Sequence, residues 1–351
     1  MGGSEQVLTL LDRAMTSAGH RSIVIAAEGS KVAGTLIPSP KVKGRLDDSI
    51  REWGRRAHRQ LILDALRKYR VDLVHMHSLD FYHYLPPGDV AVLATLHLPP
   101  DWYPASIFEM RRPLFHMNCV SWSQYRNCPH SFNMLEPISN GVDVDRLQQV
   151  VPKKKFALAL GRICPEKGYH FALDAAKKAG VELLLAGEIF PYDSHLEYFR
   201  KEIAPRLDKS RRYLGPIGFS KKRRILSQAK CLTITSTVAE TSSLVAMESL
   251  ACGTPVIAFK TGALPEIIAD GQTGFLVSSV DEMSDALGRI DQIDPDVCRQ
   301  AARSFYSATR MGTRYLDLYR ELVADQRSRK VPASAGFVTN RWLPCASSDV
   351  G

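Results

Sequence analysis

The sequence predicts an α/β protein with two Rossmann-like, doubly wound domains, each built on a parallel sheet. Short β-branched and aliphatic runs alternate with stretches that have apolar residues at three- and four-residue spacing. Strict alternation of strands and helices is typical of parallel sheets covered on both faces. The alternation stops in a polar segment at 146–155 and then restarts. The length of 351 residues suits two domains of ordinary size.

The first half of the chain supplies five clear elements. Gly19 follows the first periodic stretch and is the residue type that commonly ends a helix in a left-handed conformation. The predicted elements are strands at 22–27, 71–77 and 90–97 and helices at 4–19 and 49–69.

The second half repeats the rhythm from residue 156. The predicted elements are strands at 156–161, 181–187, 211–215, 231–236 and 254–259, and helices at 168–179, 195–204, 220–229, 243–251 and, as one helix or two, 300–324. We therefore predict an N-terminal domain over 1–148, a C-terminal domain over 153–304, a helix over 305–325 that is free to cross back to the first domain, and a tail over 326–351. The tail has no periodicity, so we expect it to be disordered.

Composition limits the class of protein. The chain is 45% hydrophobic and 24% charged, as expected of a folded domain, and no apolar run approaches the roughly 18 residues of a membrane span. Its seven cysteines are scattered and form no CxxC pair, which favours a reducing cytoplasm over a disulfide framework. The net charge of +9 suits an anionic partner such as nucleotide phosphate.

The loop after the predicted strand 156–161 carries two cations. It reads RICPEKG, with Arg162 and Lys167 ahead of the next predicted helix. In doubly wound folds, ligands bind beyond the carboxyl ends of strands, where helix N-termini offer N–H groups to anions. A guanidinium and an ammonium together suit a diphosphate, although two solvated surface cations are the alternative for this loop alone.

A second loop places two carboxylates near the same edge. Residues 239–258 read AETSSLVAMESLACGTPVIA, in which Glu240 lies on the turn before a helix and Glu248 inside that helix. Ser242 or Ser243 can cap the helix, and the N–H groups near 242–245 are suited to a phosphate. A third loop, KTGALPEI at 260–267, follows the next strand and should line the same edge.

Together these motifs resemble family 4 of the retaining glycosyltransferases, which have the GT-B architecture of two facing Rossmann-like domains. The resemblance is carried, in family order, by GGSE and AGH within 2–20, VDLVHMHS at 71–78, TLH at 95–97, PISNGVD at 137–143, GRICPEKG at 161–168, the Glu-x7-Glu of 240–248, and ACGTPVIAFKTGALPEIIADGQTGFLV at 251–277. It implies a hexosyltransferase that uses a nucleoside-diphosphate sugar and an acceptor that the sequence does not identify.

The resemblance assigns the donor site to the C-terminal domain. Arg162 and Lys167 would hold the diphosphate, Glu248 the ribose and Glu240 the hydroxyl groups of the transferred sugar. Ser242, Ser243 and Leu244 would contribute the phosphate-binding turn. Many family members have EGFG or EPFG where this chain has ETSS, so side chains narrow the space beside the donor sugar.

The N-terminal domain would complete the site. The resemblance places His97 near the anomeric centre and brings the backbone of Gly2 and Gly3 close to the phosphates. It implies no metal and no cofactor, and the sequence shows no carboxylate-rich metal cluster. Fixed cations and helix N-termini aimed at the departing diphosphate would lower the barrier.

The resemblance also implies an apolar strand ahead of Gly2-Gly3, and this sequence starts at that turn. We expect the gap to leave two neighbouring strands with unpaired edges and a slot in the core. The lost burial would amount to several kcal/mol at ~25 cal/mol per Å². The alternatives are a start upstream of this one or a truncated, non-catalytic nucleotide-sugar-binding homologue.

Two other function classes are weaker. His75 and His77 lie on one face of a predicted strand, and with His83 and His97 they could ligate zinc in a metal hydrolase, but no further ligand motif completes the set. The basic runs at 153–155, 211–212 and 221–224 are scattered and lack interleaved aromatics, which indicates solvated surface and no nucleic-acid partner.

A membrane contact depends on the acceptor. The predicted helix 49–69 carries Trp53 and four arginines within 51–59. If the acceptor is a lipid, this helix could contact the anionic inner face of a membrane from the cytoplasm.

Overall fold

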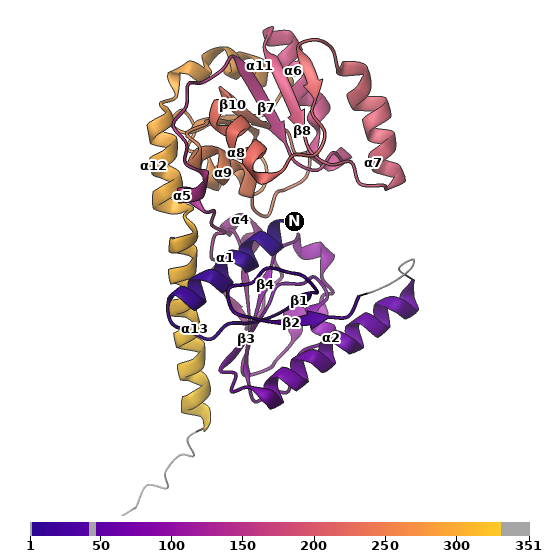
Figure 1. Ribbon diagram of the computed structural model, residues 1–351, viewed down its shortest axis with the longest axis vertical. Helices are drawn as coiled ribbons and strands as arrows, with labels where there is room; N and C mark the ends of the chain where they lie inside the picture. Colours follow the sequence, from indigo (N-terminus) through magenta and orange to yellow (C-terminus); the bar gives the residue numbers. More distant parts are fainter. Residues whose placement is uncertain (1, 42–46, 331–351) are drawn as a thin grey trace, which may run out of the picture.

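The computed structural model describes residues 2–41 and 47–330. They form two α/β domains, and helix α13 (Ala308–Lys330) leaves the second domain and runs along the first (Figure 1). This architecture confirms the predicted fold class of two parallel-sheet α/β domains.

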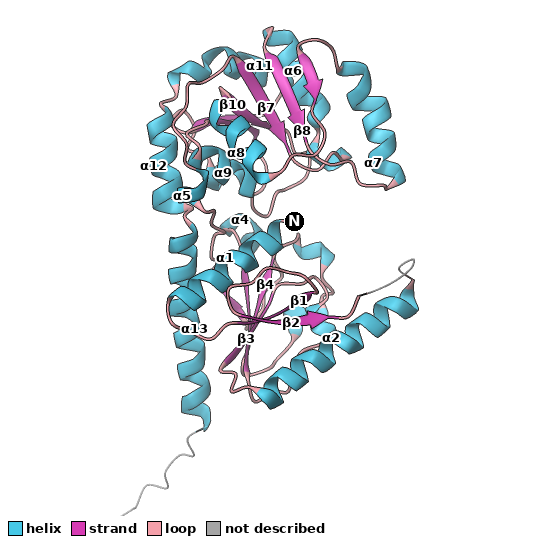
Figure 2. Cartoon of the chain, in the orientation of Figure 1, coloured by secondary structure: helices cyan, strands magenta, loops and turns pink. Residues whose placement is uncertain are grey.

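The C-terminal domain contains a six-stranded parallel sheet in the order β12-β11-β10-β7-β8-β9. All residues of the two central strands β7 and β10 are buried, because helices cover both faces of the sheet (Figure 2). The strands are β7 (Phe156–Leu160), β8 (Glu182–Ala186), β9 (Arg211–Tyr213), β10 (Cys231–Ile234), β11 (Val256–Phe259) and β12 (Gly274–Val277).

The helices of this domain follow the strands closely. They are η3 (Pro165–Lys167), α6 (Tyr169–Ala179), α7 (Asp193–Tyr198), the π-helical turn η4 (Phe199–Ile203), η5 (Ala204–Arg206), α8 (Phe219–Gln228), α9 (Leu244–Ala251), α10 (Leu264–Ile267), α11 (Val280–Arg289), η6 (Ile290–Gln292) and α12 (Pro295–Phe305). The amphipathic stretch predicted as one helix or two is thus two helices, α12 and α13.

The N-terminal domain has two separate parallel sheets, β1-β2 and β3-β4-β5-β6. The strands are β1 (Ile23–Ala27), β2 (Thr35–Ser39), β3 (Leu73–Met76), β4 (Ala91–Leu96), β5 (Phe115–Cys119) and β6 (Met134–Leu135). The helices are α1 (Gly3–Ser17), α2 (Asp48–Lys68), η1 (Phe81–His83), η2 (Pro100–Trp102), α3 (Ser106–Glu109), α4 (Trp122–Asn127) and α5 (Val144–Leu147).

Helix α13 is part of the N-terminal domain's core. Tyr315 is fully buried, and its hydroxyl lies 3.1 Å from Thr95 Oγ1 of β4. Near the end of the helix, the Gln326 side chain accepts a hydrogen bond from the Ala91 N–H and donates one to the Asp89 carbonyl. Residues 326–330, which we expected to belong to a disordered tail, instead continue helix α13, and Gln326 holds this part of the helix against the start of β4. The rest of the expected tail, 331–351, lies outside the described residues.

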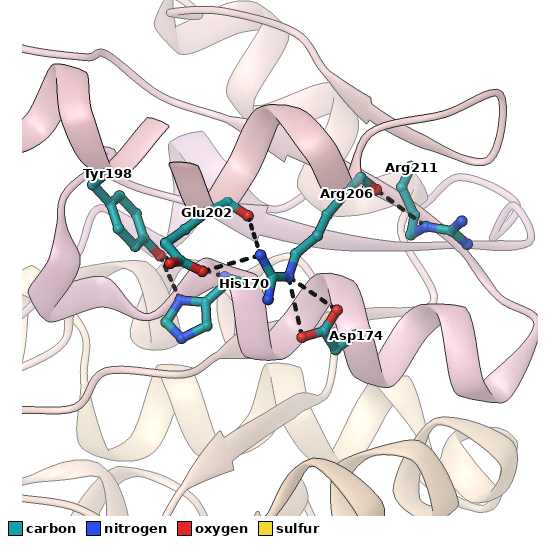
Figure 3. Close-up of polar contacts among 6 residues, drawn as sticks. All are labelled: His170, Asp174, Tyr198, Glu202, Arg206 and Arg211. Atoms are coloured by element: carbon teal, nitrogen blue, oxygen red, sulfur yellow. Dashed lines mark hydrogen bonds and ion pairs between the residues drawn. The ribbon is translucent and has the colours of Figure 1, made fainter. Parts of the chain in front are cut away.

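A polar network fixes the segment from α7 to η5 on helix α6 (Figure 3). Arg206 Nε donates to both carboxylate oxygens of Asp174, at 3.0 and 3.1 Å, and Arg206 Nη1 donates to the Glu202 carboxylate at 3.0 Å. The Tyr198 hydroxyl lies 3.0 Å from His170 Nδ1. The end of α7 and the turns that follow it are therefore held against α6.

The N-terminal domain contains a cavity of about 1070 Å³ between β1 and β3. Residues 23–25 line one wall and 73–77 the other, and Leu8 and Leu11 of α1 contribute to the lining. Within the described residues no strand pairs with both β1 and β3, so each presents an unpaired edge. This matches the expected slot in the core.

We predict that a five-residue apolar strand with a short turn, fused ahead of Met1, raises the free energy of unfolding by roughly 2–4 kcal/mol. The added strand would bury apolar side chains and pair with both free edges, and this gain exceeds the cost of ordering it. Urea unfolding measures the change. A Gly/Ser extension of the same length is the control, and equal stability of the two fusions would contradict the prediction.

Candidate functional site

The loop between β7 and α6 presents its two cations beside β10. Gly168 has φ +57°, and a Cβ there would lie 2.3 Å from the Thr235 carbonyl, so only glycine permits this close approach. Arg162 is exposed, and its guanidinium lies 5.8 Å from the centre of the Phe190 ring. Among the described residues, no carboxylate lies within ion-pair distance of Arg162. Its charge is therefore available to an anion.

Lys167 and Glu240 are in direct contact. Lys167 Nζ lies 2.5 Å from Glu240 Oε1, and the Ser236 hydroxyl donates to the same oxygen. The exposed fractions of the two side chains are 28% and 12%. The Thr235 hydroxyl also donates to the Lys167 carbonyl at 3.0 Å. The first two predicted loops thus meet at one edge of the sheet through an ion pair.

The third predicted loop contacts the backbone of Glu240. Gly262 has φ +54°, and a Cβ at this position would lie 2.3 Å from the Glu240 carbonyl. The Ala263 N–H donates to that carbonyl at 2.8 Å. The backbone of Glu240 is therefore fixed by a glycine that lets two loops touch.

Glu248 is buried, in contrast to an ordinary helix carboxylate. It is 5% exposed, and its Oε1 lies 2.5 Å from Lys222 Nζ of the preceding helix α8. Burial raises the pKa of Glu248, and the charge of Lys222 and its hydrogen bond oppose this rise. The interpretation of the basic run 221–224 as solvated surface is wrong for Lys222, because α8 packs beside α9 and turns this lysine inward.

The N-terminus of α9 lacks a side-chain cap. Ser243 is the N-cap residue, but its side chain makes no capping hydrogen bond, contrary to our expectation. The Ser242 hydroxyl oxygen is buried without a partner. With φ −131° and ψ 90° at Ser243, the turn leaves this end of the helix without a side-chain acceptor. An anion could supply the missing acceptor.

The N-terminal domain contacts this turn at two points. The Thr241 hydroxyl donates to the His97 carbonyl at 2.8 Å. Gly3, the first residue of α1, faces Leu244, since a Cβ on Gly3 would lie 3.5 Å from Leu244 Cδ1. Gly2 is the N-cap of α1, in an extended conformation. The structure thus brings His97 and Gly3 next to the turn that carries Glu240.

A third contact between the domains has no signal in the local sequence. Glu266 of α10 accepts hydrogen bonds from the N–H groups of Trp122, at 2.9 Å, and Ser123. A carboxylate at the start of α4 is favourable because it satisfies unpaired helix N–H groups. Glu266 lies within the third predicted loop, but its partner depends on how the domains pack.

The histidines near β3 and β4 are partly buried, and their pKa values are lowered. His77 Nδ1 lies 3.0 Å from His97 Nε2. Burial lowers the pKa of His75 to about 3, that of His77 well below its usual value and that of His97 to about 4. In the described parts of the chain, the one group of three side chains with metal-ligand spacing is Cys164, Glu166 and His195, so the zinc site considered for the histidines does not form.

Comparison with known proteins agrees with this geometry. Residues 1–146 match the family model described as Glycosyltransferase Family 4, and residues 144–303 match the model described as Glycosyl transferases group 1. The two adjacent matches cover both domains and all three loops of the site.

Curated relatives of this chain include glycosyltransferases. The chain is 32% identical over 220 residues to the D-inositol 3-phosphate glycosyltransferase of Saccharomonospora viridis, covering 53% of this chain and 50% of the relative. The chain spans half or less of the length of the curated relatives that it matches.

Two solved structures share the fold. They are AviGT4, a glycosyltransferase involved in avilamycin A biosynthesis (TM-score 0.70, 23% identity, 92% of this chain and 91% of that one), and Anabaena HepE in complex with UDP and glucose (TM-score 0.70, 16% identity, 91% and 96%).

We predict that Lys222→Met lowers the free energy of unfolding by about 3 kcal/mol at pH 8, because it leaves a buried carboxylate without its partner. The folded-state pKa of Glu248 would rise further above the unfolded value of 4.5. A raised carboxyl pKa makes stability fall as the pH rises through that range, so the deficit should be smaller at pH 4.5. Urea unfolding at both pH values measures this, and Lys221→Met, an exposed neighbour, is the control. A deficit independent of pH would contradict the assignment.

We also predict that the partly buried imidazoles of His75, His77 and His97 make the protein acid-sensitive. Their folded-state pKa values lie below 6.5, so their contribution to stability is present above pH 6.5 and is lost as the pH falls toward about 4. Each group contributes up to about 1.4 kcal/mol per pH unit in this range. Urea unfolding between pH 7.5 and 5 should show a shallower slope for His77→Asn than for wild type. The exposed His130→Asn is the control. An equal slope for wild type and His77→Asn would contradict the prediction.

Proposed function

The chain belongs to the family 4 glycosyltransferases, which have the GT-B fold, and from this premise we propose that it transfers a hexosyl group from a nucleoside-diphosphate sugar to an acceptor. We further propose that the transfer retains the anomeric configuration and needs no metal. The observation that carries the proposal is the contact between Lys167 and Glu240 beside the uncapped N-terminus of α9.

The cations suit a departing diphosphate. Arg162 has no carboxylate partner among the described residues, and Lys167 could exchange its contact with Glu240 for a phosphate oxygen. The N-terminus of α9 and the Ser242 hydroxyl would add donors in the same place. Donors that are already in position stabilise the negative charge that develops on the leaving group, and this electrostatic effect often lowers an enzyme's barrier more than any other.

The two glutamates suit the sugar parts of the donor. Once Lys167 turns to the phosphate, Glu240 can accept hydrogen bonds from hydroxyl groups of the transferred sugar. Glu248 is already charge-paired with Lys222, so it can accept hydrogen bonds from the ribose without carrying an uncompensated charge. Retention rests on the family resemblance alone, and that resemblance does not identify the acceptor.

His97 would act as a neutral group. With a pKa of about 4 its imidazole carries no charge near pH 7. Its Nε2 lies 3.0 Å from His77 Nδ1, which would orient the ring toward the donor sugar. We therefore assign it hydrogen bonding near the anomeric centre and no role as a cation.

Donor base, location and acceptor remain parts of the proposal. HepE was solved with UDP and glucose, which puts UDP-sugars first in a donor screen. Six of the cysteines are free thiols, in keeping with a reducing cytoplasm. No helix in the described part of the chain has the length and apolarity of a membrane span.

Contact of α2 with a membrane surface has limited support. Trp53 is 49% exposed. However, Arg51, Arg55 and Arg56 each pair with a carboxylate, which lowers the positive charge that this helix can offer to anionic lipid.

A non-catalytic homologue that still binds nucleotide sugars is the second candidate. The cavity between β1 and β3 favours it, because a loosely packed N-terminal domain would position His97 and Gly3 poorly. The C-terminal donor site does not depend on that cavity.

We predict that Lys167→Met lowers kcat/KM with the preferred donor by about 10²–10³-fold, since one fixed donor to the leaving group is lost. Transfer or donor hydrolysis with UDP-, GDP- and ADP-sugars measures this, on the chain with and without the added strand. Lys177→Met, an exposed lysine on α6, is the control. Unchanged activity of Lys167→Met would overturn the site assignment. Donor binding without transfer in both forms would support the non-catalytic candidate.

A further inference from the structure

Three metal-ligand side chains meet between the donor loop and the start of α7. One ligand atom each from Cys164, Glu166 and His195 lies within 4.8 Å of the other two. Cys164 and Glu166 belong to the loop that carries Arg162, whereas His195 comes from the following βα unit. None of the three is among the residues assigned to donor binding.

His195 is a buried polar side chain without a partner. It is 7% exposed, and its Nδ1 makes no hydrogen bond. Rings on two sides hold the imidazole: that of Phe190, stacked at 6.3 Å between centroids, and that of Tyr192, edge-on at 5.1 Å. A buried nitrogen with no partner is costly, and a bound ion would remove this cost.

The other two side chains complete a mixed ligand set. Cys164 is 1% exposed, and its Sγ donates a long hydrogen bond of 3.6 Å to the Arg162 carbonyl. Glu166 is exposed, so an ion can reach the site from solvent. Glu166 also has a fixed backbone, because its carbonyl accepts the Thr237 N–H at 2.9 Å.

We propose that Cys164, Glu166 and His195 bind one divalent thiophilic cation of the Zn²⁺ class. Sulfur, imidazole nitrogen and carboxylate oxygen together select this class over Mg²⁺ or Ca²⁺. Tetrahedral coordination places such ligand atoms about 3.5 Å apart, so the side chains need only small rotations. On binding, the Cys164 thiol loses its proton to solvent, the sulfur–metal bond forms, and water takes the fourth position.

The bound ion would tie the donor loop to α7. The segment that follows His195 is fixed on α6 by the Arg206 network (Figure 3). The Phe190 ring contacts both His195 and Arg162, so ion binding would also restrain the guanidinium. Ion and donor would then alter each other's affinity by the same factor. This coupling rests on the proposed function, whereas ion binding does not.

Cobalt titration of the full chain tests the site, because Co²⁺ occupies zinc sites and reports its ligands by absorption. We expect one Co²⁺ per chain, a thiolate-to-cobalt charge-transfer band in the near ultraviolet, and displacement by Zn²⁺. Cys164→Ser should abolish this band. His195→Ala and the exposed Glu166→Gln should weaken Co²⁺ binding at least tenfold, and Glu166→Gln leaves the buried packing intact.

Cys128→Ser is the matched control, because this half-buried thiol lies outside the cluster. Absence of saturable binding, or an unchanged spectrum in Cys164→Ser, would overturn the proposal. Titration of the same samples with UDP, GDP and ADP separates the two hypotheses. Failure of the proposed function would appear as an intact cobalt spectrum without binding of any of the three nucleotides, and failure of the metal site as nucleotide binding without the cobalt spectrum.

Discussion

The ion pair between Lys167 and Glu240 is the interaction on which the candidate site depends. It joins the loop after β7 to the loop after β10, and the close approach of Gly262 adds the loop after β11. Parallel strands end at the same edge of a sheet, so the fold brings these loops together before any ligand arrives. The pair satisfies both charges, and in the proposed function Lys167 would exchange Glu240 for a phosphate oxygen while Glu240 would turn to neutral sugar hydroxyl groups.

A second ion pair lies deeper in the site. The pair of Glu248 and Lys222 is largely buried, and it fixes a carboxylate where, in the proposed function, the ribose would be recognised. Arg162 is different, because it lies exposed against an aromatic ring without a carboxylate partner among the described residues. The site therefore combines two ion pairs with one exposed cation, Arg162, that an anion would neutralise.

Helix α13 and the contacts of Glu266 and Thr241 connect the domain that holds the cations to the domain that holds His97. The N-terminal domain is not packed evenly. Its four-stranded sheet is held by α13 through Tyr315 and Gln326, but the cavity separates that sheet from β1 and β2. Because α1 lines this cavity, the placement of Gly3 against Leu244 depends on a helix that borders an unfilled space.

Local sequence determined the alternation of strands and helices, and with it the edge at which Arg162, Lys167 and Glu240 meet. This was possible because hydrophobic period and loop position are properties of neighbouring residues. Only the tertiary structure decided the partners: Lys222 for Glu248, Glu266 for the start of α4, and Gln326 for β4. It also decided that Ser243 does not cap α9 and that His195 lies beside Cys164. These pairings join side chains far apart in the chain, and their geometry is set by how helices pack on the sheets, which no local pattern encodes.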